Sequence, residues 1–180
     1  MVIVTLAIIL VAAVSLAGDP PAGSAERATD QFRAIHKELR VHLNHMSALV
    51  SQLPRQQPAD QKATMNEIVA LLSDHIHSHA KLEEEALYPA VDKAAGTTEP
   101  YLFTATMRYE HRIVGRWISE LRNYSVQASP DVTAFARRAD NVLGLVSAHF
   151  EEEEDILLPV LDSKMTVAQF KKEVLEKMEE

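Results

Sequence analysis

Two stretches with one spacing, HAKLEEEALYP at residues 79–89 and HFEEEEDILLP at residues 149–159, decide the fold. Both read H-x-x-x-E-x-x-x-x-x-P, so a histidine precedes a glutamate by four positions and a proline follows the glutamate by six. Residues four apart lie one turn apart on the same face of an α-helix, so each imidazole and its carboxylate can reach toward one point. Each stretch is therefore predicted to be a helical arm that offers two ligands to a cation.

The segments that precede these arms repeat as well. Each contains a lone histidine followed by apolar residues at the same offsets: Leu39, Leu43 and Met46 follow His36, and Val114, Ile118 and Leu121 follow His111. These alternating steps of three and four residues indicate the buried face of an amphipathic helix. The chain is thus a doubled helix pair, and each half has one lone histidine and one arm.

Prolines, glycines and capping residues set the expected helix ends. The first helix is predicted from Asp30 to Leu53, stopped by Pro54, and the second ends at Gly96. The third is predicted to open at residues 98–99, and the fourth to follow an N-cap at Ser129.

A further helix, Val167–Met178, is predicted outside the bundle because Thr166 and Gln169 have the spacing of a capping box. Four amphipathic helices joined by short linkers are typical of an all-α, antiparallel up-down four-helix bundle. We accordingly divide the chain into an N-terminal apolar segment with its linker (1–29), the bundle (30–162) and the C-terminal helix (163–180).

Composition excludes several classes of function. The formal net charge of −8 and the absence of any cluster of Lys or Arg argue against a nucleic-acid partner. The chain has no cysteine, which excludes disulfides, thiolate nucleophiles and iron–sulfur ligation. Any metal must be held by His, Asp and Glu.

The first residues form an apolar run, MVIVTLAIILVAAVSLA (1–17), followed by a stretch rich in Gly, Pro and Ser. This pattern predicts an export signal, cleaved after Ala17, or a membrane anchor, although no Lys or Arg precedes the run. The alternative is a buried or partner-packing helix in a cytoplasmic protein.

Core-facing positions hold four imidazoles and two carboxylates, from His36, His79, Glu83, His111, His149 and Glu153. An unpaired ionised carboxylate there would cost several kcal/mol, so a cation should accompany it. The count suits two ions, each with two imidazoles, and with both glutamates bridging. Imidazole and carboxylate ligands suit iron, manganese or zinc, and the doubled, carboxylate-bridged arrangement favours two iron ions.

The order His … His-x-x-x-Glu … His … His-x-x-x-Glu resembles the hemerythrin-like, or HHE cation-binding, family over roughly residues 30–161. The resemblance implies a non-haem di-iron centre that binds O2, peroxide or NO, or that moves or senses iron, with the six residues above as ligands. Oxygen-carrying hemerythrins have a further histidine where Gly115 stands here and end with an aspartate ligand, so oxygen transport is not expected. The related iron–sulfur repair proteins need a cysteine that this chain lacks.

The other polar residues occupy several different faces of the predicted helices. His75, four before His79, is left open as a ligand, a hydrogen-bond partner or a core residue. Solvent-facing positions are predicted for His42, His45, His77, Glu84, Glu85, Arg108, Arg112, Glu151 and Glu154. Core packing is predicted for Tyr88 and Tyr109, with hydrogen-bond donation near the site as the alternative.

The functional hypothesis from the sequence is a di-iron protein that binds or reacts with a small diatomic or peroxide ligand, with turnover left open. Two alternatives remain: a module that stores or delivers iron without turnover, and a structural bundle stapled by zinc.

Overall fold

The computed structural model describes residues 26–97, 99 and 101–178 of the chain. Within these ranges every regular element is a helix and no strand is present, which confirms the predicted all-α class. The apolar segment at residues 1–17, with the export or anchoring role expected for it, lies outside the described residues. Among the helices that are described, none is both long and apolar enough to cross a membrane.

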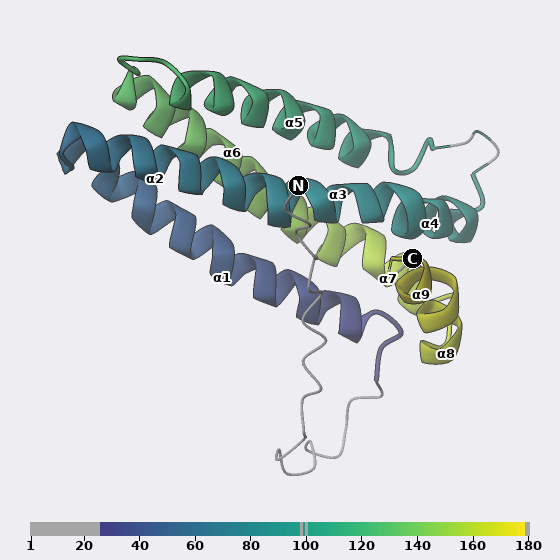
Figure 1. Ribbon diagram of the computed structural model, residues 1–180. Helices are drawn as coiled ribbons and strands as arrows, with labels where there is room; N and C mark the ends of the chain where they lie inside the picture. Colours follow the sequence, from purple (N-terminus) through teal and green to yellow (C-terminus); the bar gives the residue numbers. More distant parts are fainter. Residues whose placement is uncertain (1–25, 98, 100, 179–180) are drawn as a thin grey trace, which may run out of the picture.

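Four helical rods lie side by side in the described part of the chain (Figure 1). The first is α1 (Asp30–Gln52), which ends in the short turn η1 (Leu53–Arg55), and the third is α5 (Ala105–Ser125). The second rod consists of α2 (Pro58–Leu71), η2 (Leu72–His77), α3 (Ser78–Leu82), η3 (Glu83–Leu87) and α4 (Tyr88–Ala95). The fourth consists of α6 (Val132–Glu152), η4 (Glu153–Leu157) and α7 (Leu158–Asp162).

The segments η2, η3 and η4 are turns of π-helix inserted in the second and fourth rods. Single π-turns inside α-helices occur frequently at functional sites. Here η3 begins at Glu83 and η4 begins at Glu153, which are the two glutamates of the predicted arms.

The end of the second rod and the start of the third are fixed in different ways. Gly96 ends α4 in the left-handed conformation, with φ of 68°, as its position predicts. The third rod starts later than the predicted residues 98–99, at Ala105. Thr104, directly before it, donates hydrogen bonds from its amide and its hydroxyl to the carboxylate of Asp92. Because that carboxylate belongs to α4, a contact between rods sets this helix start.

The fourth rod begins at Val132, two residues after Pro130. Its N-cap is Asp131, whose carboxylate accepts a hydrogen bond of 2.9 Å from the amide of Ala134. The prediction of Ser129 as the N-cap is therefore wrong by two positions. A carboxylate cap also favours the positive end of the helix dipole.

The core consists of two apolar clusters with a polar level between them. One cluster contains Leu43, Met46, Leu72 and Phe135, and the other contains Phe32, Tyr88, Leu158 and Phe170. On each rod the predicted ligands fall between a residue of one cluster and a residue of the other, as His36 does between Phe32 and Leu39. The ligands are thus enclosed by apolar side chains above and below.

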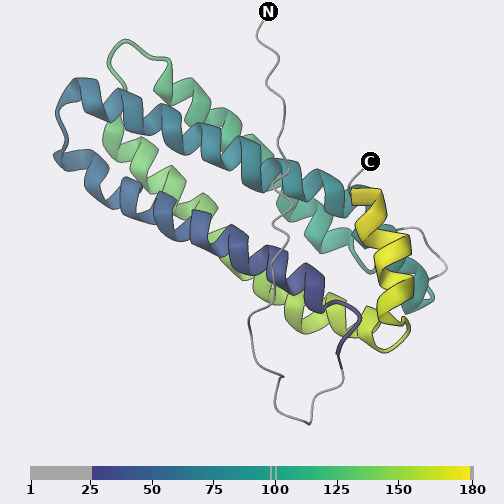
Figure 2. The same cartoon turned by 60° about the horizontal axis from the view of Figure 1, so that its bottom comes forward.

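The C-terminal segment lies across one end of the four rods (Figure 2). It consists of α8 (Val167–Phe170), η5 (Lys171–Leu175) and α9 (Glu176–Met178). The capping box predicted at its start is confirmed, because Thr166 and Gln169 each bond to the other's backbone. Phe170 packs edge-on against Phe32 at 6.5 Å between ring centroids, which covers the end of the core nearest the predicted ligands.

Candidate metal centre

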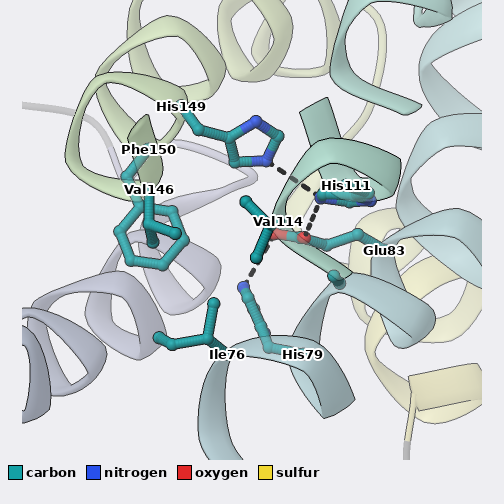
Figure 3. Close-up of a pocket in the computed structure, with 9 residues that line it drawn as sticks. Ile76, His79, Glu83, His111, Val114, Val146, His149 and Phe150 are labelled. Carbon is teal, nitrogen blue, oxygen red and sulfur yellow. Dashed lines mark hydrogen bonds and ion pairs between the residues drawn. The ribbon is translucent and has the colours of Figure 1, made fainter. Parts of the chain in front are cut away.

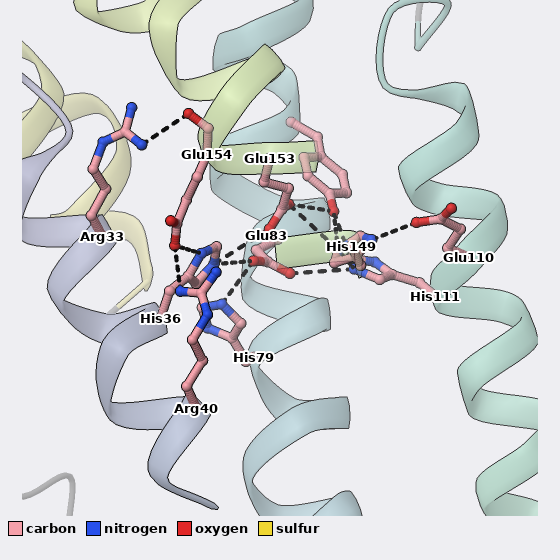
Figure 4. A network of polar contacts seen from close by, with 11 residues as sticks. Arg33, His36, Arg40, His79, Glu83, Glu110, His111, His149, Glu153 and Glu154 are labelled. Carbon is pink, nitrogen blue, oxygen red and sulfur yellow. Dashed lines mark hydrogen bonds and ion pairs between the residues drawn. The ribbon is translucent and has the colours of Figure 1, made fainter. Parts of the chain in front are cut away.

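The structure brings the predicted ligand side chains together at one level of the bundle (Figure 4). They come from all four rods: His36 from α1, His79 from α3, Glu83 from η3, His111 from α5, His149 from α6 and Glu153 from η4. Glu83 and Glu153 are at most 1% exposed. His111 is the least buried of the set, with 9% of its side chain exposed.

The two oxygens of Glu83 face different imidazoles. Oε1 lies 2.7 Å from Nε2 of His79 and 3.4 Å from Nε2 of His36. Oε2 lies 3.3 Å from Nε2 of His111. One carboxylate therefore stands between two groups of ring nitrogens.

The two oxygens of Glu153 also face different imidazoles. Its Oε2 lies 3.3 Å from Nε2 of His36, and its Oε1 lies 3.6 Å from Nε2 of His149. The hydroxyl of Tyr88 donates a hydrogen bond of 2.7 Å to Oε1. Both glutamates of the repeat thus span the same two groups of imidazoles.

The ligand atoms form two overlapping groups. His36, His79 and Glu83 each place one atom within 4.8 Å of the others, and so do Glu83, His111 and His149. Nε2 of His111 and Nε2 of His149 are 3.0 Å apart. Two imidazoles in each group and a shared carboxylate can hold cations side by side.

The pKa values of Glu83 and Glu153 are shifted in opposite directions. Burial, and then the negative charge of Glu83, raise the pKa of Glu153 well above its ordinary value. Burial acts on Glu83 in the same direction, but the positive charge of His79 and hydrogen bonds from the surrounding imidazoles outweigh it, so the pKa of Glu83 lies well below its ordinary value. A proton on Glu153 thus relieves a repulsion that a bound cation would relieve as well.

Two buried atoms of the cluster, Nε2 of His79 and Oε2 of Glu153, lie near Glu83 and His36 respectively, but no contact of either atom with the described residues has the geometry of a hydrogen bond. Buried polar atoms ordinarily find a partner. Both atoms are of types that coordinate metal ions. These unsatisfied atoms, in a set of imidazoles and carboxylates, fit a bound metal.

A sequence profile of the hemerythrin HHE cation-binding domain matches residues 27–161. The chain belongs to this hemerythrin family. The family predicted from the repeat is therefore confirmed, and the matched range contains every predicted ligand. No significant match was found among curated proteins or among solved structures.

Three further carboxylates orient the imidazoles of this hemerythrin domain. The Nδ1–H groups donate to them on the side away from the centre: His36 to Glu154 at 3.1 Å, His111 to Glu84 at 3.0 Å and His149 to Glu110 at 2.8 Å. Each of these rings therefore presents Nε2 to the centre. Such outer hydrogen bonds fix the tautomer and the orientation of metal-binding histidines.

The prediction that Glu84 and Glu154 only face solvent is wrong. Each directly follows a glutamate predicted to be a ligand, at the flank of its rod, and its long side chain reaches a histidine of the neighbouring rod. Glu85 and Glu151 are exposed, as predicted. The signal that separates these pairs is the repeat itself, because Glu84 and Glu154 occupy matching positions. Glu110 has no counterpart that would have revealed it.

Tyr88 takes part in the site as well as in the core. Its oxygen lies 3.1 Å from Nε2 of His111 and 3.2 Å from Nε2 of His149, besides its bond to Glu153. Burial and the nearby glutamates raise its pKa well above the ordinary value, so it stays a hydrogen-bond donor. Tyr109, also predicted to be buried, is 51% exposed.

The other histidines lie outside the cluster. His75 stacks on His42 at 3.9 Å between ring centroids, and both rings are half-buried. His45 is exposed as predicted, whereas His77 is half-buried and lies beside Gly115. The predicted exposure of His42 and His77 is therefore only partly correct.

A small cavity of about 10 Å³ adjoins the centre (Figure 3). Its lining combines ligands with apolar side chains: Ile76, His79, Ala80, Glu83, His111, Val114, Val146, His149 and Phe150. This volume is about that of one water-sized sphere. The space beside the predicted ligands is therefore about the size of one water molecule.

Proposed function

We propose that this chain is a hemerythrin-like di-iron protein that binds or reacts with a small ligand such as O2, peroxide or NO. The proposed ligands are His36, His79, Glu83, His111, His149 and Glu153. The observation that carries the proposal is the position of the two buried glutamates between two groups of imidazoles. In each glutamate, one carboxylate oxygen faces the first group and the other oxygen faces the second group. We also infer that the rods form an antiparallel up-down bundle, as in the sequence-based prediction.

The donor set supports iron by its chemistry. Imidazole and carboxylate suit iron, manganese and zinc alike, and a pair of bridging carboxylates is the feature that favours iron. When bound, such a pair of ions would supply coordination positions open to a small molecule. His36 and His79 would hold one ion, and His111 and His149 the other.

The side chains around the cluster have separate tasks in this proposal. The hydroxyl of Tyr88 is positioned to donate a hydrogen bond at the centre. The apolar side chains of Val114, Val146 and Phe150 border the cavity and keep bulk water away. A cavity that admits about one water-sized molecule favours a diatomic or peroxide ligand over any larger substrate.

Metal analysis of natively purified protein, combined with a visible spectrum before and after azide, tests the proposal. We expect two iron ions per chain and oxo-bridged absorption that shifts when azide is added. Iron that is released slowly to a chelator without azide-sensitive bands would point to storage or delivery instead. A colourless protein containing only zinc would point to a structural role, and either result would refute the proposal.

A further inference from the structure

The π-turn at η4 leaves one backbone carbonyl without a helical donor. The amide of Leu158 donates to the carbonyl of Glu153, as the π-helical pattern requires. The next amide in that pattern would belong to Pro159, which has no N–H. The carbonyl of Glu154 is instead satisfied from another rod, by Nη1 of Arg33 at 2.9 Å.

The π-turn at η3 has the same arrangement. The amide of Tyr88 donates to the carbonyl of Glu83, and Pro89 follows. The carbonyl of Glu84 accepts a hydrogen bond of 3.4 Å from Nη1 of Arg108. Arg108 was expected at the surface, but only 13% of its side chain is exposed. In each arm the proline thus leaves one carbonyl without a donor from its own helix, and an arginine from the neighbouring rod donates a hydrogen bond to it.

Both arginines stand three residues before the lone histidine of their rod. That histidine donates to the side chain of the same glutamate whose carbonyl the arginine holds: His36 donates to Glu154 (Figure 4), and His111 donates to Glu84. The neighbouring rod therefore donates hydrogen bonds both to the backbone carbonyl and to the carboxylate of this glutamate. The ligand glutamate is the residue directly before it, so its place along the rod is fixed by this double contact.

Beside each arginine there is a third contact, in which a threonine donates hydrogen bonds to an aspartate. Asp162 accepts from the amide and hydroxyl of Thr29, as Asp92 does from Thr104. Arg33 approaches Asp162 at 3.3 Å, and Arg108 donates to the hydroxyl of Thr104 at 3.1 Å. The repeat therefore extends to Thr-x-x-x-Arg-x-x-His at residues 29–36 and 104–111, and to Glu-Glu-x-x-x-x-Pro-x-x-Asp at residues 83–92 and 153–162.

We propose that Arg33 and Arg108 are positioning residues for the metal centre, each locking the π-turn of one ligand glutamate to the rod that carries a lone histidine. Both guanidinium groups are largely buried, with 16% and 13% of the side chain exposed, and make several bonds in fixed directions. The inference rests on the proposed function, because it assigns the arginines to the ligands of that centre.

The first test compares Arg33→Gln and Arg108→Gln with Arg138→Gln. Arg138 is a matched control because it is also partly buried and paired, to Glu120 at 2.8 Å, but belongs to neither arrangement. Iron release from the loaded protein to a chelator is expected to be about 10–100-fold faster in the first two variants and unchanged in the control. In the metal-free protein, NMR of labelled histidine should show a changed Nδ1 signal for His36 in the first variant and for His111 in the second.

Pro159→Ala provides a sharper test, because it restores an amide hydrogen opposite the carbonyl of Glu154. The double variant Arg33→Gln with Pro159→Ala is expected to release iron as fast as Arg33→Gln, because the restored amide serves the carbonyl from within the fourth rod and does not tie it to α1. If Arg33→Gln alone does not fold, Arg33→Lys, which keeps the charge with one donor group, takes its place in both comparisons.

The possible failures are distinct. A wild-type chain that takes up no iron refutes the proposed function. Iron uptake by the wild type together with wild-type release rates in Arg33→Gln and Arg108→Gln overturns only the role of the arginines. A double variant that recovers slow iron release also overturns it, since the unsatisfied carbonyl of Glu154, and not the contact between rods, would then be the cause of the fast release.

Discussion

At the level of single residues, the most informative contrast is between two glutamates that the repeat places at equivalent positions. The pKa of Glu153 is raised by burial and by Glu83, whereas imidazoles lower the pKa of Glu83 in spite of its burial. His111 has a raised pKa, because Glu83 and Glu84 outweigh the effect of burial on it. In the metal-free protein, protons therefore occupy groups that a metal ion needs.

This contrast predicts that metal affinity rises with pH. A carboxyl with a raised pKa, and a histidine with a raised pKa, keep their protons to higher pH than ordinary groups do, so metal must displace them. The apparent affinity should increase as the pH rises through the shifted pKa values of Glu153 and His111, and then level off. Competition titrations at successive pH values, with the released protons counted, measure this. An affinity that is independent of pH would contradict the assignment of these two ligands.

Replacement of a single ligand should lower metal content selectively. His79→Ala removes an imidazole from the centre, and we expect bound iron to fall to half of the wild-type value or below. The control is His45→Ala, which changes a histidine that is exposed and lies near Glu67 at 3.5 Å. Metal analysis of both variants decides the matter, and equal iron content would mean that the ligands are misassigned.

Tyr88→Phe should destabilise the metal-free protein. Its hydroxyl donates to Glu153, and removal of a partner from a buried polar group costs about 1–3 kcal/mol. Tyr109→Phe, at a half-exposed position, should change the free energy of unfolding by less than about 0.5 kcal/mol. Urea unfolding in the presence of a chelator compares the two, and equal effects would argue against the hydrogen bond of Tyr88.

The sequence predicted residues that face the core better than residues at the flank of a helix. The convergence of His79 with Glu83 follows from their spacing of four within one helix. The contact between Glu84 and His111 depends on how two rods lie against each other, which no periodicity within one rod determines. Tyr88 is a third case, because core packing and hydrogen bonding near the site were alternatives from the sequence, and the structure shows both for this one side chain.

At the level of helices, the apolar stripes predicted the rods, and their ends were harder to predict. Local signals were sufficient where the stopping residue acts alone, as Gly96 does. They were insufficient for Ala105, because the start of α5 depends on Asp92 from another rod. The π-turns were not predicted at all, since a widened turn alters backbone pairing while leaving the apolar pattern readable.

The N-cap of the fourth rod offers a test of such a helix start. Asp131→Ala should lower the free energy of unfolding by about 1 kcal/mol, because the amide of Ala134 loses its capping partner. Ser129→Ala is the matched control, since Ser129 was the cap predicted from the sequence and lies before the helix. Denaturant unfolding of both variants distinguishes the two positions, and a larger effect at Ser129 would contradict the observed cap.

For the whole molecule, the important fact is that the predicted ligands come from all four rods. A metal bound by them would tie together segments more than 100 residues apart in sequence, such as His36 and Glu153. The division of the chain into residues 1–29, 30–162 and 163–180 stays a prediction.

Metal binding should therefore stabilise the bundle as a unit. With free metal at about 100 times its dissociation constant, the expected gain in the free energy of unfolding is about 2.7 kcal/mol. Thermal unfolding of iron-loaded and chelator-treated protein measures the gain. His79→Ala should show a much smaller difference, and a wild-type melting temperature that ignores the chelator would contradict the proposed centre.

The small cavity beside the predicted ligands has a consequence for the redox chemistry of the proposed di-iron centre. A space of about 10 Å³ has no room for a molecule as large as ascorbate or a flavin. A reductant of the proposed centre would then act from the outer surface, with the electron tunnelling through packed protein. In the proposed function, the small ligand and the electron would thus take separate routes to the metal.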